Sequence, residues 1–134
     1  MPGLLVDSSV ILDVFEDDLQ WAEWSEAKLN EYSLTHVLYI NSVVYAEISI
    51  GFARIEELDA AVQAGGFVLM PIPKEALFLA GKAFLAYKKR KGQKKTPLPD
   101  FFIGAQAAVQ EMELLTRDPS RVKAYYPSVK MISP

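Results

Sequence analysis

The stretch LLVDSSVILDVF, residues 4–15, joins a short apolar run to a helical pattern through a single acidic residue. Residues Leu4–Asp7 are apolar up to the aspartate, without the alternation of polar side chains that marks a half-exposed strand. A helical pattern follows at about 8–18. A buried strand that leads directly into a helix predicts the first unit of an α/β fold, with Asp7 at the carboxyl end of the strand.

Similar units follow along the chain, since apolar strand-like segments alternate with helical patterns. We therefore predict a three-layer α/β sandwich in one domain, residues 1–134, with a mostly parallel central sheet of four or five strands flanked by helices. The further strands are expected at Val37–Asn41, Phe67–Ile72, Leu114–Thr116 and Val129–Ser133, and the further helices at 20–34, 42–64 with a break, 74–91 and 99–112.

The composition excludes several classes of protein. With 51% apolar residues in 134, the chain has enough hydrophobic surface for a substantial core. No apolar run approaches the roughly 18 residues of a membrane-spanning helix, and the amino-terminal residues lack a signal-peptide pattern. The sequence has no cysteine, which excludes disulfides and a thiol nucleophile. We expect a cytoplasmic protein without a membrane partner.

Basic residues are concentrated in one segment, KKRKGQKK at 88–95, which we call the basic segment. It holds six of the fourteen Lys and Arg residues, so the rest of the chain carries eight basic against seventeen acidic residues, a balance of −9. Such a segment can be a binding site for a polyanion, or a solvated helix end whose cations suit the helix dipole. The residues that would bind such a polyanion are Lys88, Lys89, Arg90, Lys91, Lys94 and Lys95.

Polar side chains follow three of the predicted strands. Asp7 and Ser9 follow the first. The second ends in Asn41 and Ser42, either of which is a good N-cap. Thr116 and Asp118 follow the fourth, ahead of a proline that suits a helix start. Each of these residues alone is more often a helix cap than a catalytic group. Because ligands of open parallel sheets bind beyond the carboxyl ends of the strands, their occurrence at one edge indicates a site.

Glu47 lies in a helical segment that is apolar on almost every side, so we expect this helix to be buried. An isolated buried carboxylate is unfavourable unless it is paired or coordinated. A salt bridge, for example to Arg54, is the structural alternative to a ligand role.

Asp100 begins an apolar helix whose polar stripe is predicted to be Gln106, Gln110 and Glu113. It lies instead on the side of the small residues Gly104 and Ala107, and it therefore points inward at the helix amino terminus, where an anion is favoured. A helix cap is the alternative role for Asp100.

Asp7, Glu47, Asp100 and Asp118 together form the candidate catalytic set. Four carboxylates in one place cannot all stay ionised without cations, and oxygen ligands select hard ions such as Mg²⁺ or Mn²⁺. An ion of this kind can activate water and stabilise a phosphate. Metal-independent acid–base catalysis, which typically uses two histidines, is disfavoured because His36 is the only histidine. Asp13, on the first predicted helix, is interpreted as a solvated residue.

Four segments of the sequence resemble, in order, the motifs of the PIN-domain ribonucleases, and within them the VapC-type toxins of toxin–antitoxin pairs. The segments are LLVDSSVILDVF, INSVVYAEISIG, LPDFFIGAQA and LLTRD, and the carboxyl-terminal YYPSVKMISP is also similar to the ends of these toxins. The resemblance covers nearly the whole chain. Each motif alone is weak, whereas four in order with fitting strand and helix contexts are specific.

The resemblance implies a PIN-like fold and an endoribonuclease that uses Mg²⁺ or Mn²⁺, is usually a homodimer and is inhibited by a cognate antitoxin. It implies that Asp7 and Asp100 are the main metal ligands. Glu47 and Asp118 would complete the acidic cluster by orienting water or holding a second ion. Ser9 and Thr116 would be supporting hydrogen-bond donors. With a ribonuclease implied, the cations of the basic segment become the candidate RNA-binding residues, in preference to a solvated helix end.

Two other hypotheses remain at this point. One is a non-catalytic RNA- or protein-binding module on the same fold, whose acids only stabilise structure. The other is a phosphate-handling domain of the receiver type, which is poorly supported because the first strand ends in a single aspartate.

Overall fold

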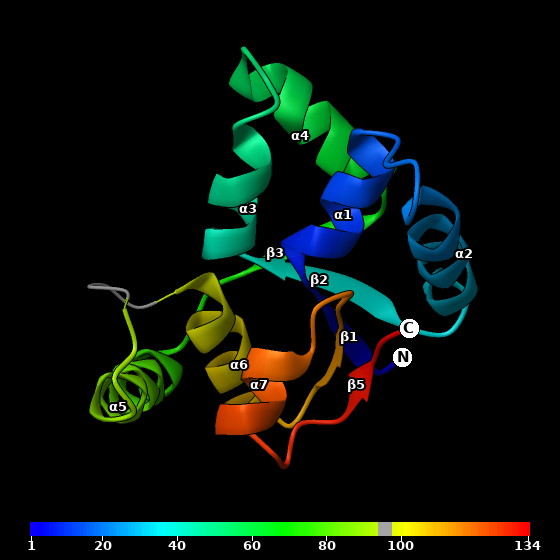
Figure 1. Ribbon diagram of the computed structural model, residues 1–134. Helices are drawn as coiled ribbons and strands as arrows, with labels where there is room; N and C mark the ends of the chain where they lie inside the picture. The colour runs from blue at the N-terminus through cyan, green and yellow to red at the C-terminus, as the bar shows by residue number, and fades with distance from the viewer. Residues whose placement is uncertain (94–97) are drawn as a thin grey trace.

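The protein is described by a computed structural model at residues 1–93 and 98–134, and a parallel sheet forms its centre (Figure 1). The strands are β1 (Gly3–Val6), β2 (Val37–Asn41), β3 (Phe67–Met70), β4 (Glu113–Leu115) and β5 (Met131–Ile132). Their order is β3-β2-β1-β4-β5, and all four pairings are parallel. The predicted fold class is confirmed, with each strand at its expected place to within a few residues.

Helices cover both faces of this sheet. Those bounded by described residues are α1 (Ser8–Phe15), α2 (Ala22–Ser33), α3 (Ser42–Ser49), α4 (Ile55–Ala64), α5 (Lys74–Lys89), α6 (Pro99–Gln110) and α7 (Ser120–Tyr125). Figure 1 shows α1 to α4 gathered on one side of the sheet and α5 to α7 on the other. The predicted break in 42–64 separates α3 from α4, and α7 begins directly after Pro119, which suits a helix start.

Strand β1 lies in the middle of the sheet because its residues can be buried on both faces. Leu4, Leu5 and Val6 are completely buried, and they pair with β2 on one side and β4 on the other. The chain leaves β1 toward β2 and β3, and later returns to the opposite side of β1 as β4. The strand order therefore reverses between β1 and β4, which is where ligands bind in open parallel sheets.

A buried amide pair joins α6 to the end of β2. Of the two N-cap candidates, Asn41 is the one that caps α3, by accepting a hydrogen bond from the backbone of Val44 at 2.8 Å. Its Nδ2 donates to Oε1 of Gln106 at 3.1 Å, and Nε2 of Gln106 donates to the carbonyl of Pro71 at 3.1 Å. The prediction that Gln106 belongs to an exposed polar stripe is wrong, because these partners satisfy its amide in the interior.

Gly104 lets α6 pack closely on α7, as the small residues of that helix face predicted. A Cβ atom there would lie 2.7 Å from Cε2 of Tyr126 and 3.3 Å from Cγ1 of Val122. Tyr126 is itself buried, and its hydroxyl donates to the carbonyl of Phe101 at 2.9 Å. The ring therefore cannot move aside without losing packing and a hydrogen bond.

We expect Gly104→Ala to lower the free energy of unfolding by about 1–3 kcal/mol, since the added methyl group overpacks the interface with Tyr126. Gly81→Ala is the matched control, because Gly81 lies within α5 and its Cβ would meet no atom within 4 Å. That control is expected to stabilise the protein by about 0.5–1 kcal/mol through helix propensity. Urea denaturation of both variants checks the prediction, and equal effects would contradict it.

Candidate active site

The reversal of strand order brings two polar residues together at the carboxyl edge of the sheet. Asp7 follows β1, and Thr116 follows β4. A hydrogen bond of 2.9 Å from the backbone nitrogen of Asp7 to the carbonyl of Leu115 holds the two strand ends in register. Residues that lie 109 positions apart in the sequence therefore meet directly.

The carboxylate of Asp7 is buried and is oriented by two hydroxyl groups. Ser9 Oγ donates to Asp7 Oδ2 at 2.8 Å, and Thr116 Oγ1 donates to the same oxygen at 2.9 Å. Although Asp7 occupies the N-cap position of α1, its side chain makes no capping hydrogen bond. Burial raises the pKa of Asp7 above its ordinary value, the two hydroxyl groups oppose this rise, and the negative charge of Asp100 adds to it. The two hydroxyl donors therefore partly offset the cost of burying this carboxyl group.

Glu47 enters the site from α3. Its Oε1 is buried and has no hydrogen-bond partner among the described residues. Burial raises the pKa of Glu47, the hydroxyl of Ser8 opposes the rise, and the charges of Asp7 and Asp100 increase it. The alternative of a salt bridge to Arg54 is not observed, since Arg54 contacts Glu56 at 3.5 Å. A buried carboxylate oxygen without a donor is the feature of this site that most needs an explanation.

The helix that carries Glu47 is less buried than we expected. Val44 and Ile48 are in the core, but Ser42 and Ala46 of the same helix are exposed. The prediction of a helix buried on almost every side is therefore wrong, because α3 has one face on the sheet and another open to solvent. Glu47 lies at the boundary between these faces.

Asp100 lies in the first turn of α6, directly after Pro99. The N-cap residue of this helix is Leu98, so Asp100 does not act as its cap. Its Oδ2 accepts a hydrogen bond from Nη1 of Arg121 at 3.0 Å. Burial raises the pKa of Asp100, Arg121 opposes the rise, and the charge of Asp118 adds to it. No motif or spacing in the sequence pointed to Arg121, which belongs to α7, a helix of six residues.

Asp118 is the most exposed of the four candidate acids, with 66% of its side chain accessible. Its backbone nitrogen donates to Thr116 Oγ1 at 3.1 Å, and its carboxylate lies 3.7 Å from Nη1 of Arg117. Asp118 is close enough to raise the pKa of Asp100. It therefore lies at the solvent-facing rim of the acids and not among them.

A buried ion pair anchors the loop that carries Thr116 and Asp118. Nε of Arg117 donates to Oδ2 of Asp13 at 2.8 Å, Ser25 Oγ donates to the same oxygen at 2.8 Å, and the guanidinium carbon lies 5.6 Å from the ring centre of Trp21. The interpretation of Asp13 as a solvated residue is wrong, since it is 3% exposed. Its partners come from other elements, so a pattern within α1 could not reveal them.

The site contains the right chemistry for a divalent cation, although its acids are not gathered around one point. Within residues 1–93 and 98–134, no three acidic, histidine or cysteine side chains are placed to hold an ion together. However, the donors are carboxylate oxygens, Glu47 Oε1 has no partner among the described residues, and the charges of Asp7 and Asp100 raise the pKa of Glu47. A hard cation would relieve each of these conditions, so the donor set fits Mg²⁺ or Mn²⁺.

The basic segment begins in the last turn of α5 with Lys88 and Lys89. The guanidinium carbon of Arg90 lies 5.1 Å from the ring centre of Tyr125, and that ring contacts Phe101, the neighbour of Asp100, at 5.3 Å between centres. Lys91 is exposed, while Lys94 and Lys95 lie outside the described residues. The described part of the segment thus reaches the α6–α7 side of the site.

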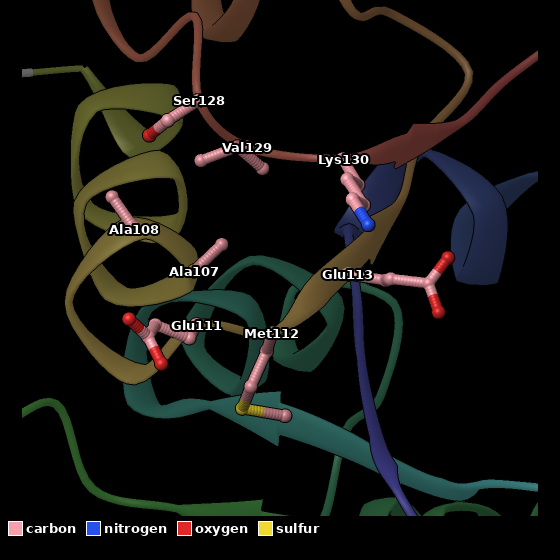
Figure 2. A pocket seen from close by; sticks show the side chains of 8 residues that line it. All are labelled: Ala107, Ala108, Glu111, Met112, Glu113, Ser128, Val129 and Lys130. Atoms are coloured by element: carbon pink, nitrogen blue, oxygen red, sulfur yellow. The ribbon is translucent and has the colours of Figure 1, made fainter.

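A cavity of about 550 Å³ lies elsewhere, at the amino edge of the sheet (Figure 2). It is bordered by the end of α6, the start of β4 and the residues just before β5, including Glu113 and Lys130. None of the four candidate acids lines it.

In the described part of the chain, no helix is long and apolar enough to cross a membrane.

Comparisons with known proteins agree with this arrangement. A family model described as the PIN domain matches residues 4–125. Among solved structures, VapBC2 from Rickettsia felis bound to a promoter DNA fragment aligns with a TM-score of 0.72 at 12% identity, covering 98% of both chains. A toxin–antitoxin complex from Klebsiella pneumoniae aligns with a TM-score of 0.67 at 20% identity, covering 95% of both chains. FitAcB from Neisseria gonorrhoeae gives 0.66 at 18% identity, covering 96% of both. No curated protein sequence matches the chain.

Proposed function

The chain belongs to the PIN domain family, and on this basis we propose that it is a metal-dependent endoribonuclease that hydrolyses RNA phosphodiester bonds. The observation that carries the proposal is the buried Oε1 of Glu47, which has no partner among the described residues and lies where the charges of Asp7 and Asp100 affect its pKa. A purely structural cluster has no need of a carboxylate oxygen in that state, whereas a cation site does.

Asp7 and Asp100 are proposed as the residues that hold Mg²⁺ or Mn²⁺. When bound, the ion would stabilise the charge on the phosphate in the transition state and lower the pKa of water. Ser9 and Thr116 orient the Asp7 carboxylate through hydrogen bonds of 2.8 and 2.9 Å. Asp118, at the rim, completes the acidic cluster from solvent.

Glu47 is proposed to accept the proton of the attacking water. Its raised pKa lies closer to neutral pH than that of an exposed glutamate, which improves a general base. Because Glu47 approaches from α3 while Asp100 approaches from α6, a water between them would be oriented from two sides. The described residues of the basic segment, Lys88, Lys89, Arg90 and Lys91, are proposed to bind phosphates of the RNA outside the site.

We further propose that the protein is the VapC-type toxin of a toxin–antitoxin pair and acts in the cytoplasm as a single PIN-like domain that dimerises. The support is the similarity in fold to a solved toxin–antitoxin complex and to the VapBC2 structure. A cognate antitoxin would then be its protein partner.

Incubation of the purified protein with RNA tests the activity directly. We expect cleavage in Mn²⁺ or Mg²⁺ and its complete loss in EDTA, with recovery when the ion is added back in excess. Cleavage that persists in EDTA would contradict the metal mechanism. If no RNA from a mixed cellular pool is cleaved with either ion, the non-catalytic binding module becomes the better description.

A further inference from the structure

Arg121 is hydrogen-bonded to Asp100, the carboxylate that is proposed to bind the cation. Its Nη1 lies 3.0 Å from Oδ2 of Asp100, and the two side chains are 37% and 28% exposed. Arg121 opposes the rise in the pKa of Asp100 that burial and Asp118 produce. Arg121 is therefore the cationic partner of this acid in the structure.

The second arginine near the acids is held quite differently. Arg117 bonds a nearly inaccessible partner, Asp13, at 2.8 Å, and its guanidinium also lies against the ring of Trp21. Arg121 has a partly exposed partner, and its guanidinium carbon lies 6.0 Å from the ring centre of Tyr87. Of these two guanidinium groups, Arg121 is the one that can leave its carboxylate without stranding a buried charge.

A divalent cation and Arg121 compete for Asp100. Oδ2 cannot accept the guanidinium and ligate an ion with the same lone pair, and the two positive charges repel one another at ligand distances. An ion that ligates Oδ2 of Asp100 would therefore displace Arg121. Because Arg121 is anchored on α7 beside Tyr87, which directly precedes Lys88 of the basic segment, the displaced group remains beside the site on its basic side. A planar guanidinium in that position suits a phosphate diester.

We propose that Arg121 is a phosphate-binding residue that the metal-free protein keeps paired with Asp100, and that binding of the divalent cation releases it to contact the RNA backbone. The inference rests on the proposed function, because it requires both an ion at Asp100 and an RNA substrate. It adds a coupling between the two: the cation makes one further phosphate contact available, so ion and RNA strengthen each other's binding.

Salt dependence of RNA binding measures that contact without relying on cleavage. We would use a fluorescently labelled single-stranded RNA of mixed sequence and a Glu47→Gln background, which retains Asp7 and Asp100 but should not consume the probe. The logarithm of the RNA association constant falls linearly with the logarithm of the salt concentration. In Mn²⁺, adding Arg121→Gln is expected to make this fall less steep by about 0.7, the contribution of one phosphate contact on a single strand. In EDTA the slopes with and without the Arg121→Gln substitution should agree, because Arg121 is then bound to Asp100.

Lys123→Gln is the matched control, since Lys123 is an exposed cation on the same helix. Any change that it causes in the slope should be the same with and without Mn²⁺. A slope for Arg121→Gln that is unchanged in Mn²⁺, or reduced equally in both conditions, would overturn the inference. A separate Mn²⁺ titration by calorimetry distinguishes failure of the proposed function from failure of the inference. If the unsubstituted protein binds no Mn²⁺, both fail. If it binds Mn²⁺ but Arg121→Gln leaves the salt dependence unchanged in Mn²⁺, or reduces it equally with and without Mn²⁺, the inference alone fails.

Discussion

Asp7→Asn and Asp100→Asn are each expected to reduce the rate of RNA cleavage at least about a hundredfold, the scale of losing one preorganised electrostatic group in an active site. Each replacement keeps the shape of the side chain and removes the negative charge that the cation requires. The fold should survive in Asp7→Asn, because the amide oxygen of the new side chain can still accept the hydrogen bonds of Ser9 and Thr116. Initial rates on labelled RNA in saturating Mn²⁺ measure the effect.

Stability separates loss of chemistry from loss of fold in the Asp7 variant. Burial raises the pKa of Asp7 in the folded protein above its value in the unfolded chain. The folded state is therefore most stable at a pH below the unfolded-state pKa, where Asp7 is protonated in both states. That stability is lost as the pH rises through the folded-state pKa, because a buried carboxyl group must then ionise. The uncharged amide of Asp7→Asn avoids that loss. The melting temperature of this variant at neutral pH in EDTA should therefore equal or exceed that of the unsubstituted protein.

Asp17→Asn is the matched control for these two substitutions. Asp17 is exposed and has a φ of 49°, a left-handed conformation that asparagine adopts readily. Full cleavage activity is expected for this variant. Full activity in Asp7→Asn and Asp100→Asn as well would contradict the assignment of these acids as metal ligands.

Arg117→Gln is expected to lower the free energy of unfolding by about 3–5 kcal/mol, because it leaves the buried charge of Asp13 without its ion-pair partner. Ser25 would remain as a donor to Asp13 Oδ2, but a neutral hydroxyl does not replace a cation. The loop that carries Thr116 and Asp118 would also lose one of its two contacts with α1, and would keep the hydrogen bond from the backbone nitrogen of residue 117 to Ser9 Oγ. Urea denaturation followed by circular dichroism gives the size of the change.

Two further variants test whether loss of the Asp13–Arg117 ion pair causes the loss of stability. Arg54→Gln removes an exposed pair in which both side chains are about 70% accessible, and it should change stability by no more than about 1 kcal/mol. The double variant Asp13→Asn/Arg117→Gln should lose less stability than the sum of its single substitutions, since neither charge is then left alone. Strictly additive losses would contradict a direct interaction.

The sheet and the strand-end residues could be predicted because they depend on local pattern and on one rule of topology. Buried strands such as Leu4–Val6 need continuous apolar runs, and parallel strands place their carboxyl ends at one edge. Asp7 and Thr116 were expected at that edge for this reason, and the hydrogen bond between them follows from it. The inward direction of Asp100 likewise followed from the small residues on its side of α6.

The polar residues that the sequence misplaced are satisfied by partners from distant segments. Gln106 was expected at the surface, but it is buried with Asn41, which lies 65 positions away, and Asp13 is buried with Arg117, 104 positions away. A single sequence does not indicate such pairings, because a polar residue on a helix is predicted to be exposed unless its buried partner is known. Arg121 was missed for the same reason, since its role depends on Asp100, 21 positions earlier.

We propose that Asp7 and Asp100 share a divalent cation where the strand order reverses. The most direct measurement is an anomalous difference map from crystals soaked in Mn²⁺. We predict a manganese peak within ligand distance of both carboxylates, with Arg121 moved away from Asp100. A map with no peak at these carboxylates, or with its only strong peak at other residues, would contradict the claim.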